Sequence, residues 1–501
     1  MYNLRKKATT LSKTNSERFY RSKAFNRAAL ISIILILTLV TAFTQIYAGH
    51  AASSKPKPPP PPPSPSNSTS WVKAYAFQYD YSAAYSVRQL PNGGFIVGGS
   101  CESGTAPTTC NGYATVIRVD ASGNLQSQSQ YSYPGHPEST ALNLIRPTTD
   151  GGAILAGQPQ SGCPETGLTG CATIVKTDSN GNIQWAKDLQ YSVTGPYSTP
   201  ATYPADLQQT SDGGYVLAGY AIAPDSYNPW IAKLGSTGQI QWQHVFADSN
   251  SQYSAAYAVR QTLDGGYVLA GEIYSGQIFV LRLDSTGAPV WQHTYSAGTD
   301  TYDNSLELTS DGGFILGGSV YNAGSSGVLL LKLDSAGNAQ WARSYVPSGS
   351  ISDLQLTMAQ QTRDGGYAFS GYYFQNTVYD ERAWLVKTDS AGNVQWDKIY
   401  GADVQYSDRK FLSFQQTSDG GFIAAGFTNQ FNNGYTSLWL VKTDSNGNIS
   451  GCSDVKNSPD VSSSITVTVS NSDLKANGDG FAYLADSLST SPGPLAATKE
   501  C

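Results

Sequence analysis

The chain has 501 residues, of which 14% are charged, and its formal net charge is -6 at pH 7. Such a balance offers no basic surface for a phosphate backbone, so we expect no nucleic-acid partner. The 50 glycines and 32 tyrosines are typical of all-β proteins with many tight turns, and they disfavour a helical architecture.

The N-terminus resembles a targeting signal. Residues 1–27 form a basic region, and residues 28–48 form an uncharged, largely apolar run. The positive-inside rule places the N-terminus in the cytoplasm and the rest of the chain outside. The run is long enough for a membrane-spanning helix, but the small residues Gly49 and Ala51 would also suit cleavage of a signal peptide. We therefore predict an extracellular or cell-surface protein whose leader is either cleaved or kept as a transmembrane anchor.

A proline-rich linker occupies residues 49–70 and contains the unbroken run Pro58–Pro63. Such a segment extends as polyproline II and cannot join a helix or a sheet. We interpret it as a stiff spacer, and a proline-rich peptide ligand is the alternative.

Residues 71–452 repeat one unit seven times. Each unit holds a glycine pair after Asn or Asp, and the first glycines of the pairs are Gly93, Gly151, Gly213, Gly265, Gly312, Gly365 and Gly420. Spacings of 47 to 62 residues suit one four-stranded blade of a β-propeller per unit. The sequence therefore predicts an all-β, seven-bladed propeller.

The last unit lacks its fourth strand, because Ser450-Gly451-Cys452 stands where other units carry a tryptophan. The missing strand is present before the first unit. Residues 71–75 match residues 396–400 in their spacing of Trp, Lys and Tyr. We predict that this N-terminal strand completes the seventh blade and closes the ring.

The repeat has the form SDGGYVLAGY followed by WLVKTDSNGNIQW. It resembles the repeats of secreted propellers from environmental bacteria and archaea, which share a superfold with kelch, quinoprotein and WD40 propellers. The resemblance covers about three-quarters of the chain and implies the fold, but it implies no catalytic residue, since one fold hosts many functions.

The longer loops between the second and third strands, and between blades, should share one rim of the ring. Variable loops on a rigid scaffold often bind ligands, and tyrosine rings with polar edges suit sugars or peptides. We expect the partner to be a glycan or a surface protein or peptide. The candidate binding residues on this rim are Tyr191, Tyr197, Tyr227, Tyr274, Tyr373, Tyr379, Asp380 and Tyr435. Packing of a loop onto a strand end is the alternative role for each.

The first strand of each unit should face the central channel. It carries a polar residue four positions before the turn Asn or Asp, namely Arg88, Arg146, Gln208, Arg260, Glu307, Gln360 and Gln415. Arg88 and Arg260 are further candidate ligand residues. The alternative is a network that satisfies buried polar groups of the channel.

Little in the sequence points to catalysis. Four histidines do not assemble a Ser-His-Asp triad or a histidine metal site, and we predict no metal and no cofactor. Acidic pairs on rim loops, such as Asp380 with Glu381 and Asp403 with Asp408, leave a carbohydrate-active enzyme open. We predict a surface binding or adhesion module, and the alternatives are that enzyme or a structural subunit of a surface assembly.

Six cysteines in an exported chain suggest disulfides. Cys101 with Cys110 and Cys163 with Cys171 would each close one rim loop, which leaves Cys452 with Cys501. The tail, residues 453–501, contains one alternating segment over residues 464–469, which we interpret as a lone strand. This strand would dock on its own propeller, and the alternative is self-assembly by addition to a neighbour's sheet.

Overall fold

The structure is a computed structural model. It describes residues 70–77, 81–102, 113–132, 140–159, 170–191, 201–223, 226–248, 253–273, 276–297, 300–322, 325–347, 351–377, 379–401, 407–432, 434–452 and seven short stretches between 455 and 499. Residues 1–69, which include the predicted leader or anchor and all but the last residue of the predicted linker, lie outside these residues. Within the described residues no helix has the length and apolar character needed to cross a membrane.

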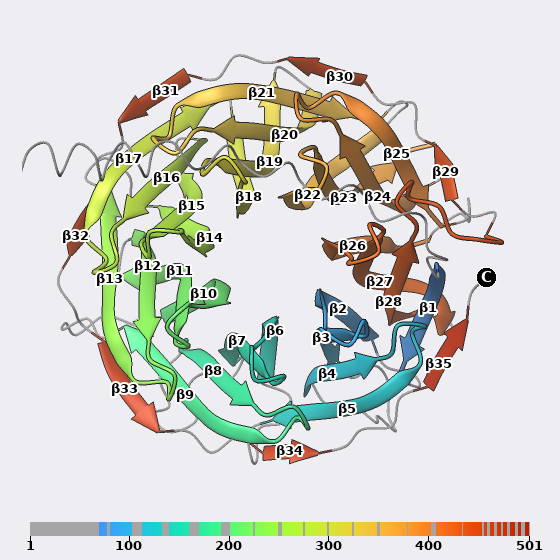
Figure 1. Cartoon of the computed structure of the whole chain (residues 1–501), viewed down its shortest axis with the longest axis horizontal. Coiled ribbons are helices and arrows are strands. Elements are labelled where there is room, and N and C mark those ends of the chain that lie inside the picture. The colour runs from blue at the N-terminus through green and yellow to red at the C-terminus, as the bar shows by residue number, and fades with distance from the viewer. Residues whose placement is uncertain are drawn as a thin grey trace, which may run out of the picture. The chain divides into compact units, whose positions relative to one another are not determined.

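The repeats form seven antiparallel blades around a central channel, as the sequence predicts (Figure 1). The first two blades are β2 (Tyr81–Gln89), β3 (Phe95–Glu102), β4 (Tyr113–Val119) and β5 (Leu125–Ser132), then β6 (Thr140–Pro147), β7 (Ala153–Pro159), β8 (Ala172–Thr177) and β9 (Ile183–Tyr191). The third and fourth are β10 (Ala201–Gln209), β11 (Tyr215–Ala223), β12 (Ser226–Leu234) and β13 (Ile240–Asp248), then β14 (Ser254–Gln261), β15 (Tyr267–Ile273), β16 (Gln277–Leu283) and β17 (Pro289–Ser296). The fifth and sixth are β18 (Asp300–Leu308), β19 (Phe314–Asn322), β20 (Ser325–Leu333) and β21 (Ala339–Val346), then β22 (Ile351–Gln361), β23 (Tyr367–Gln375), β24 (Asp380–Thr388) and β25 (Val394–Tyr400).

The seventh blade closes the ring with the N-terminal strand. It consists of β26 (Arg409–Gln416), β27 (Phe422–Asn432), β28 (Tyr435–Thr443) and β1 (Trp71–Ala76). β1 pairs antiparallel with β28, with Trp71 opposite Lys442 and Tyr75 opposite Leu438. The predicted closure is therefore confirmed.

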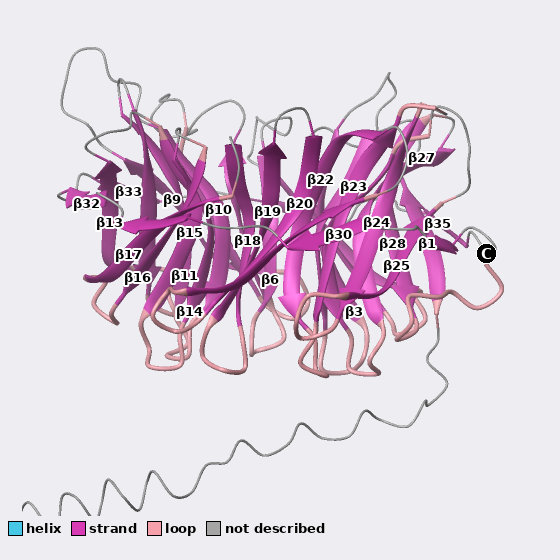
Figure 2. Ribbon diagram, turned by 90° about the horizontal axis from the view of Figure 1, so that it is seen from above, coloured by secondary structure: helices cyan, strands magenta, loops and turns pink. Residues whose placement is uncertain are grey.

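In blades two to seven an aspartate fixes the glycine-pair turn, and in the first blade Asn92 Oδ1 accepts the corresponding hydrogen bond from the Gly94 amide. In the third blade the Asp212 carboxylate accepts hydrogen bonds from the Thr210 hydroxyl and the Gly214 amide. It also pairs with Lys233 Nζ at 2.9 Å, and the corresponding ion pair recurs in blades two to seven. In each of these turns the aspartate thus holds the lysine or arginine side chain of the blade's third strand. The turns lie at one face of the ring, along the lower edge of Figure 2.

Tryptophans and glycines of neighbouring blades pack together, which explains why the repeat carries both. A Cβ atom on Gly337 would lie 2.7 Å from His293 Cδ2 and 2.8 Å from Trp291, and Gly337 has a φ of +83°. Tyr295 adds a hydrogen bond of 2.6 Å to the Gly337 carbonyl. The outer strand of one blade is thereby attached to the last turn of the next.

The C-terminal tail encircles the ring and adds a fifth strand to every blade (Figure 1). Its strands are β29 (Val455–Asn457), β30 (Val461–Ser464), β31 (Thr468–Asn471), β32 (Leu474–Asn477), β33 (Phe481–Ala485), β34 (Ser489–Ser491) and β35 (Ala496–Lys499). They pair antiparallel with β25, β21, β17, β13, β9, β5 and β1 in that order. The tail therefore passes the blades in reverse chain order and covers the outer edge of each one.

This arrangement corrects the prediction of a lone strand over residues 464–469. β30 ends at Ser464 on the fifth blade, and β31 begins at Thr468 on the fourth. The alternating segment thus spans two blades. Docking of the tail on its own propeller, which we expected, is what the structure shows.

Three cysteines of the described residues, Cys101, Cys171 and Cys452, are disulfide-bonded. Cys110, Cys163 and Cys501 lie outside the described residues, so the three pairings stay predictions.

Candidate functional site

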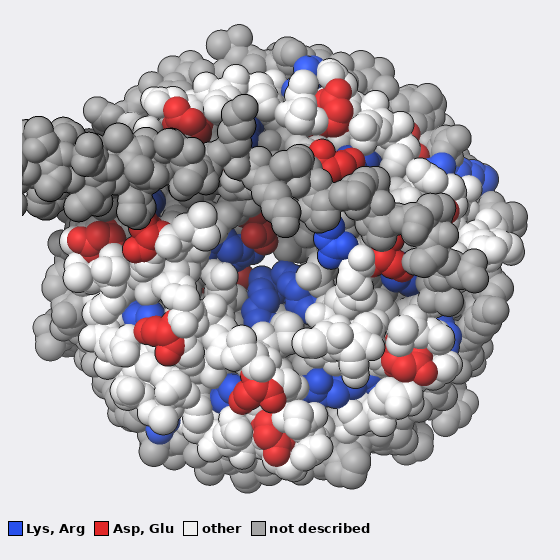
Figure 3. All heavy atoms as spheres, in the orientation of Figure 1, with Lys and Arg blue, Asp and Glu red and all other residues white. Residues whose placement is uncertain are grey.

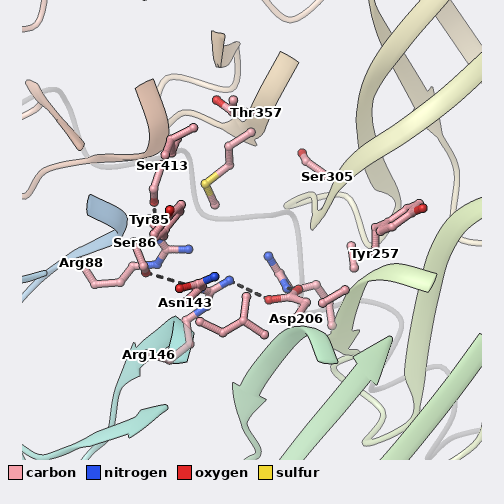
Figure 4. Close-up of a pocket in the computed structure, with 16 residues that line it drawn as sticks. Tyr85, Ser86, Arg88, Asn143, Arg146, Asp206, Tyr257, Ser305, Thr357 and Ser413 are labelled. Carbon is pink, nitrogen blue, oxygen red and sulfur yellow. Dashed lines mark hydrogen bonds and ion pairs between the residues drawn. The ribbon is translucent and has the colours of Figure 1, made fainter. Parts of the chain in front are cut away.

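The inner strand of each blade carries a β-bulge close to the channel. In β2 the register shifts between Ala84 and Ser86, and in β14 it shifts between Ala256 and Ala258. Tyr85 and Tyr257 are thus the extra residues of their strands. A bulge re-aims side chains locally, and both tyrosines line a cavity in the channel (Figure 4).

The cavity has a volume of about 140 Å³ and is lined by residues from the inner strands of all seven blades. Its polar lining residues are Tyr85, Ser86, Arg88, Asn143, Arg146, Asp206, Tyr257, Arg260, Ser305, Thr357 and Ser413. Figure 3 shows basic side chains around the central opening. The channel is therefore a polar pocket with a cationic wall.

Two carboxylates hold two of its three arginines. Asp206 pairs with Arg146 Nη2 at 2.7 Å and with Arg260 Nη1, while Arg260 Nη2 pairs with Glu307 at 2.7 Å. Burial alone would raise the pKa of Asp206, but Arg260 and Arg146 outweigh burial and hold this pKa below its usual value. Burial alone would lower the pKa of Arg260, but Asp206 and Glu307 raise it overall. Arg260 thus belongs to a network of ion pairs with Asp206 and Glu307. Such a network is the alternative role that the sequence analysis gives to the polar residues of the first strands.

Arg88 has a different environment. Its Nη1 donates to the Val87 carbonyl at 2.7 Å and to the Ser413 hydroxyl at 3.1 Å. Burial, and after it the neighbouring Arg146 guanidinium, lower the pKa of Arg88 to about 9. The side chain therefore remains cationic at neutral pH, without an ion pair to a carboxylate among the described residues.

The rim carries a continuous row of tyrosines across the third and fourth blades. Tyr203 stacks on Tyr220 with ring centroids 4.7 Å apart, Tyr220 meets Tyr227 edge-on at 5.7 Å, and Tyr227 meets Tyr253 edge-on at 5.1 Å. The backbones of Tyr227 and Tyr253 form a β-bridge between the blades. Tyr227 and Tyr253 are 38% and 41% exposed. We call these four residues the tyrosine row.

Other predicted rim residues have varied surroundings. Tyr379 is 56% exposed and has a positive φ of 54°. Tyr435 packs edge-on against the exposed Tyr81 at 5.0 Å. Tyr373 is buried against Trp384, and Asp380 is buried and pairs with Arg382 at 3.1 Å.

The remaining candidates fall outside the described part of the chain. Tyr197 and Tyr274 are not among the described residues, and Tyr191 ends β9 with an undescribed side chain.

One acidic pair forms on the rim, between residues that the sequence placed in separate pairs. Burial, and after it the neighbouring Glu381 carboxyl, raises the pKa of Asp408 to about 7. Lys410 Nζ lies 2.8 Å from Glu381 and 4.4 Å from the centre of the Tyr372 ring. Glu381 is thus engaged by a cation on one side and adjoins a second carboxyl on the other.

Sequence reasoning missed Tyr85, Tyr257 and Asp206 as channel residues. If side chains simply alternated between the two faces of the first strand, these three residues would not be assigned to the channel. The bulge in that strand shifts the register and changes the face that follows it. One signal was available: residues 82–89 and 254–261 read SAAYSVRQ and SAAYAVRQ. Two nearly identical inner strands in an otherwise divergent set mark the channel side chains that they share.

No protein-family model and no curated protein sequence matches the chain. Among solved structures, the polysaccharide lyase Uly1 is 10% identical with a TM-score of 0.42, over 72% of this chain and 90% of that chain. Sqt1 of Chaetomium thermophilum, bound to the N-terminus of the ribosomal protein L10, is 11% identical with a TM-score of 0.40, over 71% and 85%. A protein of unknown function from Dyadobacter fermentans is 10% identical with a TM-score of 0.37, over 74% and 97%. These similarities concern the fold only, and no activity is taken from them.

Proposed function

We propose that the protein is a binding module of the cell surface or the extracellular medium whose rim recognises a glycan. The tyrosine row carries this proposal. Its rings contact one another in sequence, two of them are more than a third exposed, and main-chain pairing holds them across two blades. Rigid aromatic faces bind the apolar faces of sugars with little loss of conformational entropy.

Binding without catalysis is favoured by the groups near this row. Across the described residues there is no group of three or more His, Cys, Asp or Glu side chains that could hold a metal ion. His244 and His293 stack on Trp242 and Trp291 of the outer strands. On the rim, the Glu381 carboxylate is paired with Lys410.

A glycan array combined with a reducing-sugar assay tests the proposal. We expect the protein to retain a restricted set of glycans and to release no reducing ends from them. Release of reducing ends from a retained glycan would make the protein an enzyme and overturn the proposal. Failure to retain any glycan, when a peptide or surface protein is retained instead, would overturn the ligand class.

A further inference from the structure

The inner strands of the first and fourth blades provide a natural comparison. Their nearly identical sequences place Arg88 and Arg260 at equivalent positions. Both arginines donate from Nη1 to the preceding carbonyl, at 2.7 Å for Arg88 and 2.6 Å for Arg260. The local backbone therefore holds the two guanidinium groups in the same way.

The neighbouring blades make the two sites electrically different. Arg260 lies between Asp206 and Glu307 and pairs with both. Arg88 lies beside Arg146 and the Ser413 hydroxyl instead. Three guanidinium groups face two carboxylates in this network, so the described channel residues carry one unbalanced positive charge.

Arg88 is half-buried, and an unbalanced charge that is partly removed from water is costly, because such ions need a partner of opposite sign. Arg88 uses Nη1 for both of its hydrogen bonds to described residues. Its Nε and Nη2 groups are therefore available as a fork of donors, the geometry that binds carboxylates and phosphates in a bidentate manner.

The cavity beside Arg88 has room for such a ligand. Its volume of about 140 Å³ would hold several water molecules or one small anion. The Ser86 and Ser413 hydroxyls line it together with Arg146 (Figure 4). The Asn143 Oδ1 atom is buried there with no donor among the described residues. Reversal of that amide would direct its NH₂ group at an anion.

We propose that the central channel holds an oxyanion-binding site in which Arg88 and Arg146 bind a carboxylate or phosphate group. The site is separate from the tyrosine row and does not depend on the function proposed for the rim. Its ligand is either a free small oxyanion or the acidic group of a larger molecule that reaches into the channel, and both present the same chemistry to the guanidinium fork.

Thermal melting in the presence of anions tests the site. Inorganic phosphate, at ten times its dissociation constant and constant ionic strength set with chloride, should raise the melting temperature by roughly 2 °C. Arg88→Gln should lose this shift, and Arg88→Lys should retain only part of it because the fork is lost. Arg363→Gln, which makes the same change at an exposed arginine, should retain the full shift.

The outcomes separate the two sources and the two proposals. The acidic group of a sugar can supply the anion if glucuronate shifts the melting temperature, glucose does not, and Arg88→Gln loses the effect of glucuronate. If phosphate alone shifts the melting temperature, the ligand is a free ion. Tyr227→Ala should leave either response unchanged, so failure of the rim proposal does not affect this test. No shift in the unsubstituted protein with either anion, or an equal shift in Arg88→Gln, would refute the channel site.

Discussion

The tail should form a covalent hoop around the propeller. Its two ends come to the same strand, because Ser450 N donates to Ser70 Oγ at 2.8 Å and Lys499 lies opposite Lys73 on β1. Cys452 packs against the cluster that contains Val72. The described part of the tail therefore begins and ends beside β1. We therefore expect Cys501 to be the disulfide partner of Cys452.

Opening this hoop should cost a measurable part of the stability. The bond encloses about 50 residues, for which loop-closure entropy gives about 4 kcal/mol. We predict that Cys452→Ser with Cys501→Ser lowers the free energy of unfolding by up to about that amount. The double variant Cys101→Ser with Cys110→Ser, which opens a short loop, should cost about 1 kcal/mol less.

Two assays test whether the disulfide between Cys452 and Cys501 holds the tail strands on the blades. Denaturant unfolding gives the loss of stability, and limited proteolysis reports whether the tail strands remain protected. We expect residues 455–499 to become sensitive to protease in the Cys452 variant and to stay protected in the Cys101 variant. A free thiol at Cys501, a disulfide to a second copy of the chain, or unchanged stability and protection would refute the reasoning.

Three further predictions follow from the ring itself. Deletion of residues 71–75 should lower the melting temperature strongly, because β1 connects β28 to β35, and an unchanged melting temperature would contradict the closure. Gly337→Ala should lower the free energy of unfolding, measured with denaturant, more than Gly213→Ala does. Both glycines have a positive φ, which costs an alanine about 1 to 2 kcal/mol. Only the new Cβ at position 337 would also meet the Trp291 ring, because a Cβ on Gly213 meets nothing within 4 Å. Burial would raise the pKa of Asp150, but hydrogen bonds from Lys176 and others lower it to about 2. The stability that the ionised Asp150 carboxylate contributes is therefore present above pH 4 and is lost as the pH falls towards 2. In urea titrations, the free energy of unfolding of Asp150→Asn should depend less on pH over this range.

The propeller fold could be predicted from the sequence because the repeat is regular. Each glycine pair marks a turn that requires positive φ, as Gly213 shows with a φ of +80°, and the tryptophan spacing marks the outer strands. The match between residues 71–75 and 396–400 was enough to predict the closure. These features are local, and seven copies make the pattern unmistakable.

The tail and the channel depend on partners that one repeat does not reveal. The tail strands are three to five residues long, and they pair through main-chain groups along existing sheet edges, which needs little pattern in the side chains. Arg88 and Arg260 occupy equivalent sequences, so their difference comes from Asp206 and Glu307 on adjacent blades. On the rim, the neighbours Tyr372 and Tyr373 point to opposite faces of β23, and only the register decides which one is buried.

The most direct test of the proposed function is the dissociation constant of a glycan retained on the array, measured for three proteins. Tyr227→Ala combined with Tyr253→Ala should weaken binding at least about tenfold, since buried aromatic contacts in an interface are commonly worth more than 1.4 kcal/mol. Leu263→Ala, which removes a 96% exposed apolar side chain from the turn face of the ring, should bind as the unsubstituted protein does. Equal dissociation constants for all three proteins would show that the tyrosine row does not bind the glycan.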